Sequence, residues 1–189
     1  MHKLLFLALL ILSNPANARI EEAIFAGGCF WRMEADFHKL NGVLATVVGF
    51  DGGTSKDPSY TQVMTGDTDY AVAVRVIYNS QQISYQDLVN YFWRRIDPTS
   101  HNAQFCDYGS QFRSAIFYLN DTQKKIALAS KQKVEKIFPK VYTQITPSTQ
   151  FYAAEDEHQE YYLNHPLRYK YYYYRCGYEA RIKKLWRDT

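Results

Sequence analysis

The spacing of apolar positions along this chain changes several times, and each change marks a boundary between predicted elements. An apolar run at residues 23–26 predicts a short buried strand, and two glycines then allow a sharp turn into a helix over 30–40. Four further stretches rich in β-branched and apolar residues predict strands: 43–50, 70–78, 113–119 and 141–145. Helical spacing or capping residues predict four more helical segments: 60–64, 84–96, 120–138 and 155–163.

The main elements follow one another in the order β-α-β-β-α-β, with additions. This order predicts an α+β fold, a two-layer sandwich with a split β-α-β (ferredoxin-like) core. The sequence has no internal repeat and no linker, and its one biased tract is a tyrosine cluster around 169–174. We therefore expect residues 19–189 to form a single domain.

The first 18 residues have the features of a secretory signal peptide. A basic start containing Lys3 precedes an apolar stretch at 4–12, and small residues ending at Ala18 provide a cleavage site. The apolar stretch is too short to span a membrane as a stable helix. We expect cleavage after Ala18 and export to the periplasm or the medium, without a membrane span in the mature protein; an uncleaved N-terminal anchor is the alternative.

The near-neutral net charge bears on which kinds of partner the protein can bind. Removal of Lys3 with the leader would change the formal net charge from +3 to +2, which argues against a dedicated nucleic-acid binder. The tyrosines at 169–174 resemble a stacking platform for single strands, but without a basic groove they indicate packing around the C-terminal segment. We expect no nucleic-acid partner and a monomeric protein.

Three cysteines, Cys29, Cys106 and Cys176, indicate redox chemistry rather than a disulfide scaffold. An odd number leaves at least one thiol unpaired in a monomer. The chain has no C-x-x-C pair, and the cysteine spacings match no zinc site, so we expect neither a metal nor a bound cofactor.

Cys29 is the candidate nucleophile, because the predicted turn places it at the start of a helix. Unpaired backbone N–H groups and the helix dipole favour a thiolate there. Phe30 and Trp31 follow at once, and their rings would form an apolar wall for a small group that carries a reactive atom. The alternative is a buried structural cysteine.

The tetrapeptide Gly28-Cys29-Phe30-Trp31 resembles that of the A-type peptide methionine sulfoxide reductases. Further blocks similar to that family follow in order across nearly the whole chain: 49–53, 57–60, 66–68, 92–93, 97–98, 107–111, 113–116 and 154–159.

The resemblance implies a reaction. Cys29 would attack the sulfur of methionine S-sulfoxide, peptide-bound or free, and become a sulfenic acid as methionine leaves. Cys176 would then form a disulfide, which an external dithiol of the thioredoxin type reduces; Cys106 is the alternative resolving residue. Phe30 and Trp31 would bind the methyl group of the substrate. Oxidised proteins or peptides and a thioredoxin-fold reductant are therefore the expected partners.

Two family positions differ on the side of the sulfoxide oxygen. Tyr60 and Asp107 match residues that the family uses there, but Val72 stands where the family has a glutamate and Phe112 where it has a second tyrosine. Loss of one preorganised donor commonly lowers a rate by ~10²–10³-fold. Because residues 70 and 72 of a strand face the same side, Tyr70 is a hypothetical replacement donor at the substrate, unless it is only a strand aromatic.

These losses leave two other classes of function open. A catalytically weakened relative would bind methionine sulfoxide or a partner protein without efficient turnover. A general thiol peroxidase or disulfide-exchange protein is less favoured, because the chain lacks a C-x-x-C pair.

Overall fold

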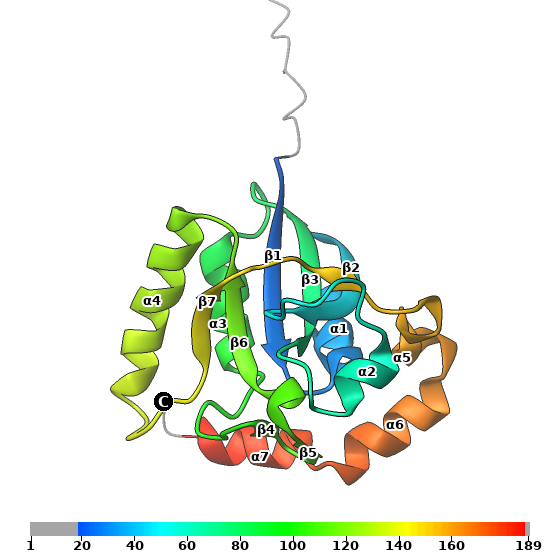
Figure 1. The fold of residues 1–189 in the computed structure, drawn as a ribbon. Coiled ribbons are helices and arrows are strands. Elements are labelled where there is room, and N and C mark those ends of the chain that lie inside the picture. Colours follow the sequence, from blue (N-terminus) through cyan, green and yellow to red (C-terminus); the bar gives the residue numbers. More distant parts are fainter. Residues whose placement is uncertain (1–18, 188–189) are drawn as a thin grey trace, which may run out of the picture.

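The predicted strands pair into one six-stranded sheet in the computed structural model, which describes residues 19–187 (Figure 1). The strands follow the order β7-β6-β1-β3-β2-β8, and every neighbouring pair is antiparallel except β6 and β7. Their bounds are Ile20–Gly27 (β1), Val43–Asp51 (β2), Ala71–Asn79 (β3), Ser114–Tyr118 (β6), Gln144–Pro147 (β7) and Tyr152–Ala153 (β8). The expected leader peptide at 1–18 lies outside the described residues.

The core has the predicted topology. Helix α1 (Phe30–His38) connects β1 to β2, and helix α3 (Tyr85–Trp93) connects β3 to β6. The sheet order β6-β1-β3-β2 places the first and fourth strands of the β-α-β-β-α-β unit side by side, with the third next to the first. This is the split β-α-β arrangement, so the expected α+β sandwich is confirmed.

The two faces of the sheet have different covers. Phe25 packs in one cluster with Phe37 of α1 and Phe92 of α3, its ring 4.9 and 5.2 Å from theirs. Ile24, its neighbour in β1, belongs to a second cluster on the other face, against which Phe151 packs. The segment between β7 and β8, which carries Phe151, crosses that face in Figure 1. Because successive side chains of β1 point to opposite faces of the sheet, the strand is buried on both faces.

The C-terminal region differs from the expectation. The predicted helix over 155–163 is divided into a 3₁₀ turn (Asp156–His158) and the short helix α5 (Tyr161–Asn164), because Glu160 between them adopts a left-handed conformation with φ 49°. The tyrosine-rich tract, for which no element was predicted, forms helix α6 (Pro166–Arg175), and α7 (Tyr178–Leu185) follows it.

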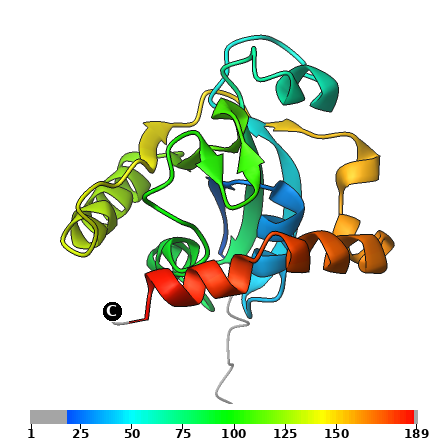
Figure 2. The same cartoon turned by 90° about the horizontal axis from the view of Figure 1, so that it is seen from below.

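Helices α6 and α7 lie end to end across the end of the molecule where β1 finishes (Figures 1 and 2). The remaining helices are α2 (Tyr60–Met64) and α4 (Asp121–Glu135). Within residues 19–187, no helix combines the length and the apolar character that a bilayer crossing requires.

A buried ion network fixes α1 beneath the end of β1. The Arg32 side chain is 1% exposed, donates to the carbonyl oxygen of Gly27 at 2.7 Å, and pairs with Asp36 at 2.9 Å. Arg95, which follows α3, also pairs with Asp36 at 2.8 Å and reaches Glu179 of α7 at 3.2 Å. Asp36 therefore connects α1 to the residue after the C-cap of α3, and Arg95 extends the network to α7.

We predict that Asp36→Asn lowers the free energy of unfolding by about 3–5 kcal/mol, since it leaves the buried Arg32 charge without its counter-ion. Urea unfolding followed by fluorescence measures the loss. Glu179→Gln is the matched control, because this partner of Arg95 is 64% exposed and should contribute less than about 1 kcal/mol. Equal losses in the two variants would contradict the central role of Asp36.

Candidate active site

A cavity of about 120 Å³ lies beside the first turn of α1. Its walls come from α1, α2, β3, α6 and the segment between α3 and β6. The lining residues are Cys29, Phe30, Trp31, Tyr60, Met64, Val72, Asp107, Phe112 and Tyr172. Sulfur, aromatic rings, hydroxyls and one carboxyl group thus face a space large enough for a small side chain.

The turn between β1 and α1 directs Cys29 into this cavity. Gly28 has a φ of +80°, and a Cβ there would lie 2.6 Å from the Cβ of Gln104, so glycine is required on both counts. Cys29 is the N-cap residue of α1, and its carbonyl oxygen accepts from the backbone N–H of Arg32 and of Met33 at 3.2 Å. Its own side chain is 7% exposed.

The acidity of Cys29 differs from the expectation. Burial, and after it the charge of Asp107, raises the pKa of the Cys29 thiol to about 11. Backbone N–H groups at the helix start and the Tyr172 side chain act in the opposite direction, but their effect is smaller. The helix start therefore favours the thiolate, as the sequence predicts, but burial outweighs this effect and keeps Cys29 a thiol at neutral pH.

Aromatic rings form the wall next to the sulfur, as the sequence predicts for Phe30 and Trp31. The Trp31 ring stacks on Tyr161 of α5 at 3.8 Å with an interplanar angle of 9°. Tyr60, at the first position of α2, lies 4.0 Å from the His158 ring and 5.9 Å from the Phe30 ring. Burial and the neighbouring Cys29 raise the pKa of Tyr60 to about 12, so its hydroxyl keeps its proton at neutral pH.

Asp107 reaches the cavity from a small hairpin of strands β4 (Ala103–Gln104) and β5 (Asp107–Tyr108), for which the sequence pattern predicted no strand. The fully buried Gln104 fixes this hairpin, because its side chain donates to the Asp97 carbonyl at 2.7 Å and accepts from the Asp97 N–H at 2.9 Å. Burial raises the pKa of Asp107, although hydrogen bonds from Tyr172 and from the Cys29 backbone oppose this shift.

The cavity contains the two apolar replacements recognised in the sequence. Val72 of β3 and Phe112, at the end of the 3₁₀ turn Ser110–Phe112, both line it. Neither offers a hydrogen bond to a sulfoxide.

Tyr70 does not replace them. It is 1% exposed, it is not among the cavity-lining residues, and its hydroxyl donates to the carbonyl oxygen of Ser55. Strand alternation gives Tyr70 the same face as Val72, as expected, but its long side chain extends to the loop before α2. The hypothesis that Tyr70 contacts the substrate is therefore wrong.

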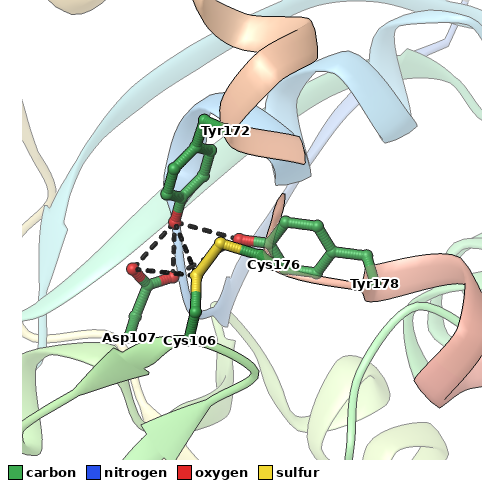
Figure 3. Close-up of a disulfide and its surroundings, with 5 residues drawn as sticks. All are labelled: Cys106, Asp107, Tyr172, Cys176 and Tyr178. Atoms are coloured by element: carbon green, nitrogen blue, oxygen red, sulfur yellow. Dashed lines mark hydrogen bonds between the residues drawn. A yellow bond between two sulfur atoms is a disulfide. The ribbon is translucent and has the colours of Figure 1, made fainter. Parts of the chain in front are cut away.

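Tyr172 of α6 is the cavity residue that sequence reasoning missed. Its hydroxyl donates to the Asp107 carboxylate, with both carboxylate oxygens 2.7 Å away, and accepts from the Tyr178 hydroxyl at 2.9 Å (Figure 3). A signal was present in the sequence, since Tyr172 precedes Cys176 by one helical turn. This spacing is informative only if residues 166–175 are known to form helix α6.

The two candidate resolving cysteines are bonded to each other. Cys106 and Cys176 form a disulfide with a Cα–Cα distance of 5.3 Å, and Cys29 is the free cysteine (Figure 3). The Tyr172 hydroxyl lies 3.8 Å from the Cys106 sulfur, so the disulfide adjoins the cavity. Among residues 19–187, no cluster of three or more histidine, cysteine or acidic side chains is placed to hold a metal.

The comparisons with known proteins agree on one family. The family model described as "Peptide methionine sulfoxide reductase" matches residues 21–189. A curated relative from Methanosarcina acetivorans, named peptide methionine sulfoxide reductase MsrA, is 48% identical over 155 residues, which cover 80% of this chain and 82% of that protein.

Solved structures give the same result. Mxr1 from Saccharomyces cerevisiae in reduced form has a TM-score of 0.75 and 34% identity, covering 79% of this chain and 88% of Mxr1. A structure of Mxr1 in complex with Trx2 has a TM-score of 0.55 and 25% identity, covering 77% of this chain and 86% of that one.

We predict that alkylation of Cys29 by iodoacetamide, with the disulfide intact, accelerates about tenfold per pH unit from neutral pH to about pH 10, because only the thiolate reacts. Asp107→Asn should accelerate alkylation at neutral pH, since it removes a negative charge that raises the thiol pKa. Mass spectrometry at timed points measures both rates. A plateau below about pH 8 would show that Cys29 is already ionised and would contradict the raised pKa.

Proposed function

The chain belongs to the peptide methionine sulfoxide reductase family and reduces methionine sulfoxide with thiols, and we propose that Cys29 is the residue that attacks the sulfoxide sulfur. The observation that carries this assignment is the cavity, because Cys29 is the free cysteine and lines it together with aromatic rings and hydroxyl groups. Attack forms a bond between the Cys29 sulfur and the sulfoxide sulfur. The oxygen then passes to the Cys29 sulfur, as this S–S bond and the S–O bond of the substrate break. The thiol is oxidised to a sulfenic acid and the sulfoxide is reduced to methionine.

The apolar part of the cavity supports recognition of the S-epimer. Phe30 and Trp31 would contact the methyl group of the substrate, and Met64 closes the same pocket. With the methyl group on the rings and the sulfur facing Cys29, one configuration directs its oxygen towards Tyr60 and Asp107. We assign these two residues to the oxygen side of the site.

Cys176 is the resolving residue in our proposal, and Cys106 follows it. Cys176 would attack the sulfenic acid of Cys29 and release water. The thiol of Cys106 would then attack the new disulfide at Cys176 and return Cys29 to its thiol form. The Cys106–Cys176 disulfide is the product of this exchange, and it leaves Cys29 ready for another substrate.

An external dithiol completes the cycle in the proposal. The Cys106 residue is exposed, which favours attack from outside the protein. The yeast relative forms a complex with Trx2. We therefore assign a thioredoxin-fold protein as the reductant, and methionine sulfoxide in peptides or oxidised proteins as the substrate.

The proposal also includes the location and the oligomeric state of the protein. We assign the protein to the periplasm or the medium, with a mature domain that begins at Arg19, on the basis of the leader-like composition of residues 1–18. We also propose that it is a monomer, since residues of a single chain line the cavity. N-terminal sequencing of protein from the extracytoplasmic fraction should begin at Arg19. Full-length protein retained in the cytoplasm would contradict export, and a dimer mass by light scattering would contradict the monomer.

The thiol sequence predicts how much methionine forms when no reductant is added. Fully reduced protein should convert about two equivalents of a methionine-S-sulfoxide peptide, one by the disulfide and one by the Cys29 sulfenic acid. Cys29→Ser should form none. Mass spectrometry of the peptide measures the yield, and absence of methionine from the parent protein while the peptide still binds would favour a binding protein without turnover.

Single variants distinguish the two candidate resolving cysteines, Cys106 and Cys176. Cys106→Ser should stop after about one equivalent, with a Cys29–Cys176 disulfide. Cys176→Ser should also form about one equivalent but leave a sulfenic acid that dimedone labels. A rapid Cys29–Cys106 disulfide in Cys176→Ser would instead make Cys106 the direct resolving residue.

A further inference from the structure

We propose that Tyr172, from the C-terminal helix α6, is a catalytic residue of this site that gives its proton to the sulfoxide oxygen. The inference rests on the proposed function of Cys29. The family has a glutamate and a tyrosine at the positions of Val72 and Phe112. The Tyr172 hydroxyl reaches the same cavity from a different element of the fold.

The position of Tyr172 fits this role. It lines the cavity together with Cys29, and its side chain lowers the pKa of the Cys29 thiol, so it stands next to the reacting atoms. Tyr60 lines the same cavity, and the two phenols are therefore the hydroxyl donors available to a bound sulfoxide. Burial and the charge of Cys29 raise the pKa of Tyr172, so the phenol holds its proton until an acceptor arrives.

Asp107 provides the return path for the proton. Tyr172 lies 2.7 Å from both of its carboxylate oxygens, and the Cys29 backbone also hydrogen-bonds Asp107. As Cys29 attacks, its thiol proton passes to the Asp107 carboxylate. Asp107 then returns a proton to Tyr172 as Tyr172 protonates the oxygen. The net result is Cys29–S–OH and methionine, with the thiol proton on the transferred oxygen and no outside acid needed.

Two further contacts hold the phenol in place. The Tyr178 hydroxyl donates to the Tyr172 oxygen at 2.9 Å, so the Tyr172 proton itself points to an acceptor, which is the Asp107 carboxylate before substrate binds. The Cys176 N–H donates to the Tyr172 carbonyl at 3.1 Å, and Cys176 is bonded to Cys106. The disulfide therefore anchors the helical turn that carries Tyr172, close to the hairpin that carries Asp107.

The test is single-turnover reduction of a methionine-S-sulfoxide peptide by the full mature protein with its Cys106–Cys176 disulfide formed. Tyr172→Phe should slow formation of the first methionine by about 100-fold, because one preorganised donor is lost. The matched control is Tyr174→Phe on the same helix, since Tyr174 is 90% exposed and should keep the parent rate. A Tyr172→Phe rate within about threefold of the parent would overturn the proposal.

The dependence of the rate on buffer acids distinguishes a structural role of Tyr172 from a role as proton donor. At constant pH, the parent rate should not depend on the concentration of imidazolium buffer, whereas the Tyr172→Phe rate should rise with it, because an outside acid then supplies the proton. A slow variant without this dependence would make Tyr172 a structural residue and overturn the proposal.

Should Tyr172→Phe not fold, 3-fluorotyrosine at position 172 keeps the ring and hydroxyl but is a stronger acid. It should raise the first-turnover rate, and an unchanged rate would overturn the proposal. A parent protein that forms no methionine would overturn the proposed function itself, so the two failures are distinct.

Discussion

The hydrogen bond between Tyr172 and Asp107 is the contact on which the active site depends. It joins a helix near the C-terminus to the hairpin beside Cys29, residues separated by 65 positions in the chain. It also gives the Asp107 carboxylate its strongest hydrogen bond, beside the one from the Cys29 backbone, and it closes one wall of the cavity. Without it, the cavity would keep its aromatic wall but lose the polar side to which we assign the sulfoxide oxygen.

The same contact sets an order of events. Tyr172 and Cys176 lie one turn apart on α6, so Cys176 can approach Cys29 only if the turn that carries Tyr172 also moves. In the proposed reaction, proton donation by Tyr172 and attack by Cys176 therefore take place in two successive positions of this helix end. Gly177, left-handed with φ +63° and with nothing within 4 Å of its ideal Cβ position, separates this turn from α7 and gives it a point of rotation.

Local signals predicted the central part of this structure well. The β1 strand, the turn at Gly28 and the start of α1 follow from apolar alternation and glycine chemistry within about ten residues. The same signals placed Cys29, Phe30 and Trp31 at the cavity. The core topology followed from the order of elements.

The remaining features arise from contacts that the sequence pattern does not encode. None of the residues in α6 is buried, and its half-buried face is made of tyrosines that lie within a run of tyrosines, so the sequence pattern did not reveal the helix or its register. The pKa of Cys29 depends on burial and on Asp107, both set by the folded chain. Tyr70 illustrates a third limit, because alternation assigns a face of the sheet but not the point that a long side chain reaches.

The most direct test of the account is a crystal structure of Cys29→Ser, with the Cys106–Cys176 disulfide formed, bound to a methionine-S-sulfoxide peptide. The account predicts a sulfoxide oxygen within about 2.5–3.0 Å of the Tyr172 hydroxyl, with the methyl group on Phe30 and Trp31. A bound sulfoxide whose oxygen lies away from Tyr172, or a Tyr172 withdrawn from the cavity, would contradict it.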